Sequence, residues 1–102
     1  PRPPLSPACA RIGRFGSRWA LLVLLTLHEG GVLRFGELVR AVPGGISERM
    51  LSAALRDLEG AGLVARRVYP EVPPRVEYAT TPKTESLMPI LRQLLDWARE
   101  NA

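Results

Sequence analysis

Apolar residues recur at helical spacing in two segments of the chain, but they extend to different distances around the two helices. Within residues 48–61, the leucines Leu51, Leu55 and Leu58 stand at i, i+4 and i+7. This spacing predicts an amphipathic helix that buries one face and exposes the other. Residues 18–29 are apolar on nearly every side, which predicts a helix at the centre of the hydrophobic core.

Three further segments carry shorter or less regular patterns. Residues 32–35 favour a short strand, and residues 36–42 favour a helix of about two turns that Pro43 ends. Residues 82–101 carry apolar residues that recur three and four positions apart over a long stretch, so we expect a final helix there. Pro89 lies inside this segment, and its ring would meet the preceding turn and kink the helix axis.

A β-hairpin with an unusual tip is predicted before the final helix. Residues 63–69 and 76–81 are rich in β-branched and aromatic residues, as strands are. Their connection is longer than that of an ordinary hairpin and holds Pro70, Pro73 and Pro74. Proline fixes φ and donates no backbone hydrogen bond, so it suits a hairpin tip and not a central strand. We therefore expect a stiff, extended tip.

The order of these elements predicts the fold. Two consecutive helices joined by residues 42–46 form a helix-turn-helix, and the hairpin that follows makes it winged. We expect an α+β, mostly helical fold: a winged helix-turn-helix with a β-hairpin wing and flanking N- and C-terminal dimerisation helices. The single domain, residues 1–102, would comprise an N-terminal arm and short helix (1–16), the winged core (17–81) and a C-terminal dimerisation helix (82–102).

Basic residues exceed acidic ones, and the excess is confined to one part of the chain. The formal net charge is +4 and the isoelectric point is about 10.2. Residues 1–81 hold eleven arginines and seven acidic residues, whereas residues 82–102 hold three basic and three acidic residues. This distribution favours an anionic partner for the first part. Thirteen of the 14 basic residues are arginine. The planar guanidinium group of arginine suits phosphate and guanine. A GC-rich genome would also produce this excess of arginine over lysine.

The residues also argue against several other classes of protein. Cys9 is the single cysteine, so we expect neither an internal disulfide nor a cysteine metal site, and a cytoplasmic location. The longest apolar run, residues 19–27, is too short to span a bilayer. The proline-rich start does not look like a secretory signal.

The sequence contains none of the motifs that would indicate an enzyme. There is no glycine-rich phosphate loop with its lysine, no nucleophile-histidine-acid arrangement that the fold would assemble, and no carboxylate pair in a cleft. His28, the single histidine, has no Cys or His partner nearby and suits compensation of a helix dipole. We therefore expect no enzyme, no metal and no cofactor.

Three stretches, in this order, resemble a known family. They are GSRWALLVLLTL (16–27), RFGELVRAVPGGISERMLSAALRDLEGAGLV (34–64) and RRVYPEVPPRVEYATTP (66–82). They look like the HxlR-type branch of the MarR-like winged-helix transcription regulators, and the resemblance covers roughly residues 9–98. It implies homodimers that bind imperfect inverted repeats of DNA and regulate transcription, some of them in response to oxidants or electrophiles.

Position in this architecture selects the candidate DNA-binding residues. Arg49, Ser52 and Arg56 lie opposite the leucines of their helix and suit a recognition surface, although such a charged helix face is often merely solvated. A wing-tip arginine suits the minor groove or a phosphate, while Glu71 and Glu77 are expected to pair with arginines. The predicted DNA-binding set is Arg34, Ser47, Arg49, Met50, Ser52, Ala53, Arg56, Arg67, Pro73, Pro74 and Arg75.

The last helix carries more apolar surface than one small domain needs, so we expect it to pair with a second copy of the chain. The predicted interface residues are Trp19, Leu87, Leu91, Leu94, Leu95, Trp97 and Ala98. Cys9, in the predicted first helix, is either a small buried hydrophobe or an oxidant sensor.

Two functions from different classes remain. The favoured one is a homodimeric, sequence-specific transcription regulator that binds an inverted-repeat operator in double-stranded DNA. Its recognition helix would enter the major groove, and its proline-rich wing would meet the minor groove or the backbone. Oxidants or small molecules are candidate signals, and no membrane partner is expected. The alternative is a winged helix used for protein contacts without DNA. It is favoured by Ala53 and Ala54, which stand where the family often has Gln-Arg.

Overall fold

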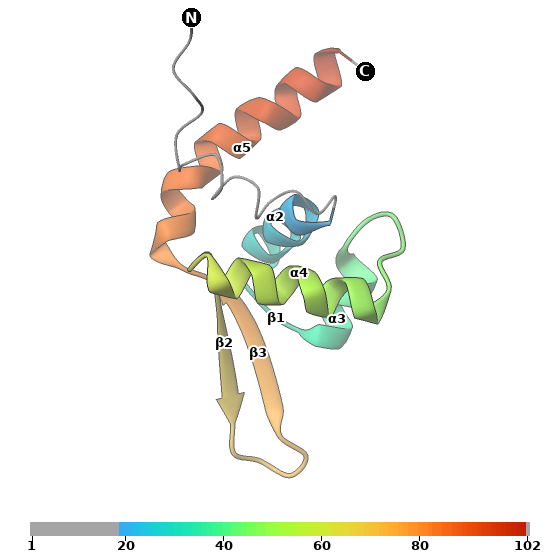
Figure 1. The fold of residues 1–102 in the computed structure, drawn as a ribbon, viewed down its shortest axis with the longest axis vertical. Coiled ribbons are helices and arrows are strands. Elements are labelled where there is room, and N and C mark those ends of the chain that lie inside the picture. Colours follow the sequence, from blue (N-terminus) through green and yellow to red (C-terminus); the bar gives the residue numbers. More distant parts are fainter. Residues whose placement is uncertain (1–18, 102) are drawn as a thin grey trace, which may run out of the picture.

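The protein is described by a computed structural model, which describes the structure of residues 19–101. This part of the chain folds into four helices and a three-stranded antiparallel sheet (Figure 1). The elements are α2 (Ala20–Gly30), β1 (Val32–Arg34), α3 (Phe35–Ala41), α4 (Glu48–Gly60), β2 (Val64–Tyr69), β3 (Arg75–Thr80) and α5 (Pro82–Glu100). The predicted first helix, with Cys9, lies outside the described residues.

The α+β winged-helix fold is confirmed, and the element bounds fall close to the predicted ones. Each of the described helices and strands begins and ends within two residues of its predicted position, which is the usual uncertainty of such ends. The largest difference is at α2, which begins at Ala20 after Trp19 and not at residue 18.

The wing is the outer half of the hairpin β2–β3. The strand order is β1–β3–β2, so β3 lies in the middle of the sheet. The hairpin ladder runs from the pair Val64–Thr80 at its base to the pair Tyr69–Arg75 at its end, whereas β1 pairs with β3 no further out than Glu77. The end of the hairpin therefore extends past β1 and away from the helices (Figure 1).

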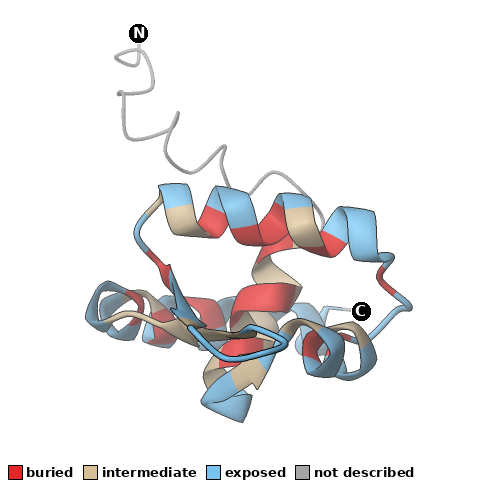
Figure 2. Ribbon diagram, turned by 90° about the horizontal axis from the view of Figure 1, so that it is seen from below, coloured by how far each residue is buried: buried red, intermediate tan, exposed pale blue. Residues whose placement is uncertain are grey.

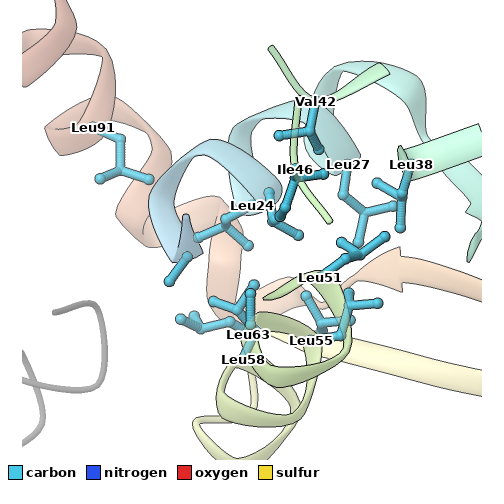
Figure 3. Close-up of a cluster of buried hydrophobic side chains, with 14 of the residues drawn as sticks. Leu24, Leu27, Leu38, Val42, Ile46, Leu51, Leu55, Leu58, Leu63 and Leu91 are labelled. Atoms are coloured by element: carbon cyan, nitrogen blue, oxygen red, sulfur yellow. The ribbon is translucent and has the colours of Figure 1, made fainter. Parts of the chain in front are cut away.

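One hydrophobic cluster joins the helices (Figure 3). Its centre is α2, which buries Ala20, Val23, Leu24 and Leu27. The cluster also contains α4 residues, namely Leu51, Ala54, Leu55 and Leu58. Fully burying a leucine side chain contributes about 1.5 to 3 kcal/mol, so this cluster determines which face of α4 points inwards. Exposed positions lie on the opposite sides of the helices (Figure 2).

The final helix α5 has two apolar stripes, and only one of them packs inside the protomer. Thr84, Met88 and Leu91 are buried, whereas Ile90 and Leu94 are exposed. The two stripes lie roughly a third of a turn apart around the helix. Pro89 lies inside α5, and the helix axis changes direction along its length (Figure 1). No helix within residues 19–101 is both long enough and apolar enough to cross a membrane.

Side chains at the start of α5 bond to the backbone between α4 and β2. Thr81 Oγ1 donates to Gly62 O at 2.6 Å, Lys83 Nζ to Ala61 O at 2.8 Å and Thr84 Oγ1 to Leu63 O at 2.6 Å. These carbonyls belong to the connection that follows α4, where backbone acceptors have no helical partner and bond to side-chain donors. We call this set of three hydrogen bonds the α5 clasp, because it ties the last helix to the end of α4.

The α5 clasp generates a stability prediction at Thr84, which is completely buried. Thr84→Val keeps the shape but removes the hydroxyl donor, so we expect the free energy of unfolding to fall by about 1 to 2 kcal/mol. Urea unfolding followed by circular dichroism measures it. Ser86→Ala is the matched control, since it removes an exposed hydroxyl from the same helix and should change stability by less than about 0.5 kcal/mol. Equal stability of Thr84→Val and the unmodified protein would contradict this role.

Candidate nucleic-acid interface

The second helix of the helix-turn-helix, α4, begins with a side-chain cap. Ser47 has an extended backbone, and its Oγ accepts a hydrogen bond from the Met50 N–H at 3.1 Å. The turn before it contains Gly44 and Gly45, both with positive φ. A Cβ on Gly44 would lie 3.2 Å from the Trp19 ring. Glycine is therefore required at position 44 for both its conformation and its close approach to Trp19.

The face of α4 opposite the leucines is exposed, and its positively charged arginines are not paired with a carboxylate among the described residues. Arg49, Ala53 and Arg56 are exposed, and Ser52 is half-buried at the edge of this face. Neither arginine makes an ion pair with any residue in the described part of the chain. A helix that shows two unpaired guanidinium groups and small neighbours can approach a negatively charged surface closely.

Two adjacent alanines of α4 face in different directions. Ala53 is exposed on the arginine face, and Ala54 is buried in the core between α4 and α2. Of the two positions that depart from the family pattern, only Ala53 therefore lies where a partner could contact it. Met50 is also exposed, beside this face.

The two faces of the hairpin place neighbouring arginines differently. Directly opposite residues share a face of the sheet. Arg66 is opposite Tyr78, whose side chain packs against the core. Arg67 is opposite Glu77 on the other face. Arg67 is the predicted DNA contact, whereas the exposed Arg66 lies on the face directed towards the helices.

Glu77 lies between arginines on the outer face of the sheet. It is directly opposite Arg67 on one side and Arg34 on the other. The Arg34 N–H donates to the Glu37 carboxylate at 2.8 Å, which closes the start of α3, and the Arg34 side chain is exposed. Arg34 therefore lies at the junction between the sheet and the helix-turn-helix.

The wing arginine Arg75 is held by three neighbours within the wing. Its Nη2 lies 3.5 Å from Glu71 Oε1 and its Nε 3.8 Å from Glu77 Oε2. Its Cζ lies 3.9 Å from the centroid of the Tyr69 ring. The expected pairing of Glu71 and Glu77 with an arginine is confirmed. The tip itself, with Val72, Pro73 and Pro74, is exposed.

The hydroxyl of Tyr69 has an arginine partner of its own. Arg67 Nη1 donates to Tyr69 Oη at 3.5 Å. This hydrogen bond, together with the attraction of Glu77, raises the pKa of the Arg67 guanidinium above its already high ordinary value. Arg67 is therefore charged under all physiological conditions.

Two polar contacts between α2 and α5 were not predicted from the sequence. His28 Nε2 lies 3.1 Å from Glu85 Oε1, and Arg92 Nη2 lies 3.4 Å from Glu29 Oε1. His28 was expected only to compensate the helix dipole. Each pair joins residues more than fifty positions apart, so sequence spacing carried no signal for them.

The predicted interface residues fall into two groups. Leu91 is only 6% exposed and belongs to the protomer's own hydrophobic core. Trp19, Leu87 and Leu95 are half-buried. In contrast, Leu94 is 50% exposed and Trp97 is 62% exposed, and Ile90 lies with them on the outer stripe of α5. Ala98 is exposed near the end of the same helix.

A helix-turn-helix followed by an extended hairpin defines the winged-helix class of proteins. A family model described as an HxlR-like helix-turn-helix matches residues 14–102. The chain belongs to this family, whose relatives are transcription regulators of the HxlR and MarR-like type and not enzymes.

Individual relatives agree with this assignment. The chain is 50% identical over 88 residues to an HTH-type transcriptional regulator of Methanothermobacter thermautotrophicus, covering 86% of this chain and 66% of that protein. The chain therefore spans just under two thirds of the length of that relative. A crystal structure of a MarR-family regulator from Porphyromonas gingivalis has a TM-score of 0.82 and 39% identity, over 100% of this chain and 98% of the other. The reduced form of the redox regulator HypR has a TM-score of 0.81 and 38% identity, over 94% and 93%.

Proposed function

We propose that the protein is a homodimeric transcription regulator that binds a specific inverted-repeat site in double-stranded DNA. The main support for this proposal is the exposed face of α4, where Arg49 and Arg56 have no carboxylate partner among the described residues. In a helix-turn-helix the second helix lies in the major groove. There Arg49 and Arg56 suit guanine, and Ser52 suits a base or a phosphate.

The proposed DNA surface continues on both sides of this face. Ser47 and the first backbone N–H groups of α4 suit a phosphate, because a helix N-terminus favours negative charge. Met50 and Ala53 suit apolar contact with bases. Arg34 and Arg67 share the outer face of the sheet and suit the DNA backbone beside the groove, and the tip prolines Pro73 and Pro74 suit the minor groove.

We also propose that the outer stripe of α5 forms the dimer interface. Ile90, Leu94 and Trp97 are large apolar side chains on one side of this helix, and they are exposed in the protomer. Contact with a second copy would bury them, together with Ala98 and the half-buried Leu95. A two-fold dimer sets two recognition helices about one duplex turn apart, which matches an inverted repeat.

The alternative of a protein-contact module without DNA has less support. The family match and the named relatives are transcription regulators. Ala54, one of the two residues that favoured the alternative, is buried and takes no part in either kind of contact.

An oxidant is the signal that the comparisons support best. The redox regulator HypR is among the structures that this chain resembles. Cys9 is the one cysteine in this sequence, so a disulfide formed by it would join two chains.

The DNA proposal predicts a loss of affinity from α4 substitutions. Arg49→Ala and Arg56→Ala should each weaken specific binding by about 1 to 3 kcal/mol, as expected for an arginine that reads guanine. Fluorescence anisotropy with a fragment selected from the genome measures this. Arg99→Ala removes the same charge from the far end of α5 and serves as the control. If Arg49→Ala and Arg56→Ala both bind as tightly as the unmodified protein and the Arg99→Ala control, α4 is not the recognition helix.

The dimer proposal predicts that Leu94→Glu produces monomers. The added carboxylate would be buried without a partner in the interface, while the protomer fold stays intact because Leu94 is half exposed. Sedimentation velocity gives the oligomeric state, and circular dichroism checks the fold. Gln93→Glu adds the same charge at the neighbouring exposed position and should leave the dimer unchanged. A dimer of undiminished stability in Leu94→Glu would place the interface elsewhere.

The oxidant proposal is tested with diamide or peroxide. Treatment should change the DNA affinity of the unmodified protein and produce linked dimers on non-reducing gels. Cys9→Ser should lack both responses, because its hydroxyl forms no disulfide. The same change of affinity in both proteins would remove Cys9 from the mechanism.

A further inference from the structure

Arg75 occupies the position where the hairpin ladder ends and the wing tip begins. It is directly opposite Tyr69, the last residue of β2. The Glu71 N–H donates to the Tyr69 carbonyl at 2.8 Å and starts the turn of the tip. The Arg75 guanidinium contacts the Tyr69 ring, the Glu71 carboxylate and the Glu77 carboxylate. One side chain therefore connects both strands and the tip.

These contacts make Arg75 a poor phosphate ligand. Its single positive charge is offset by two carboxylates, and its Nε is out of contact with solvent. Moving the guanidinium to a phosphate would leave Glu71 and Glu77 unpaired close to the DNA backbone, where like charges repel. It would also break the stacking on Tyr69, a contact that favours a guanidinium held against a ring.

The tip presents an apolar side chain instead of a charged one. Val72 is fully exposed, and Pro70, Pro73 and Pro74 surround it. Prolines fix the backbone of the tip, so little conformational entropy is lost when it makes contact. Apolar side chains of this kind contact the sugars and base edges of the DNA minor groove in proteins that bind there.

We infer that Arg75 is a positioning residue that closes the base of the wing tip, and that the wing meets the minor groove through Val72 and its neighbouring prolines. This inference rests on the proposed DNA binding and replaces the predicted direct contact of Arg75 with DNA. The wing would then respond to the width and deformability of the groove, while α4 reads the bases.

The salt dependence of binding separates the two roles of Arg75. Each phosphate contact adds about 0.9 to the slope of log affinity against log salt. We expect Arg75→Ala to weaken binding by a similar factor of about 3 to 10 at every salt concentration, because a loosened tip must be ordered on binding. Its slope should equal that of the unmodified protein. Arg75→Lys keeps the charge but loses the planar stack and fork, so we expect it to behave like Arg75→Ala. A slope reduced by about one unit in Arg75→Ala but not in Arg75→Lys would overturn the inference.

Val72 provides an independent test, since a fully exposed side chain contributes little to folding. We expect Val72→Ser to leave the free energy of unfolding unchanged and to weaken DNA binding about fivefold, through lost apolar contact. Val32→Ser, at an exposed valine in β1, should leave the affinity unchanged. Undiminished affinity in Val72→Ser would overturn the assignment of the tip. Absence of DNA binding by the unmodified protein would refute the proposed function as well, whereas the outcomes at Arg75 and Val72 concern the wing alone.

Discussion

The packing of the leucine face of α4 against α2 is the constraint on which the rest of the structure depends. Leu51, Leu55 and Leu58 lie in the same cluster as Leu24 and Leu27, all of them buried. Removing one such side chain typically costs about 2 to 5 kcal/mol, a large fraction of the stability of a domain of this size. The arginine face lies on the side of α4 opposite the leucines. Burying the leucines therefore exposes the arginines to solvent.

The α5 clasp extends this constraint to the two ends of the molecule. Its hydrogen bonds hold the start of α5 against the connection between α4 and β2. From that point the hairpin leads to the wing, and α5 leads in the opposite direction to its exposed apolar stripe (Figure 1). The proposed DNA face, wing and dimer surface are thus attached to one junction, in which the Thr84 hydrogen bond is buried.

Local patterns predicted the elements well, because proline and leucine spacing act within a few residues. The end of α3 before Pro43 and the leucine face of α4 are examples. Contacts between residues distant in the sequence were harder to predict. Both stripes of α5 are apolar, and only the packing in the protomer's hydrophobic core decides that Leu91 faces inwards and Leu94 outwards. The pairing of Glu71 and Glu77 with an arginine was expected, but the choice of Arg75 as their common partner depends on how the tip folds back.

The central claim is that two copies of α4, related by a two-fold axis, read one DNA site. Selection of genomic fragments by the purified protein, followed by sequencing, tests it most directly. The account predicts enrichment of an inverted repeat whose half-site centres lie about 10 base pairs apart, or a multiple of that distance. Recovery of no common sequence, or of single or directly repeated half-sites, would contradict it.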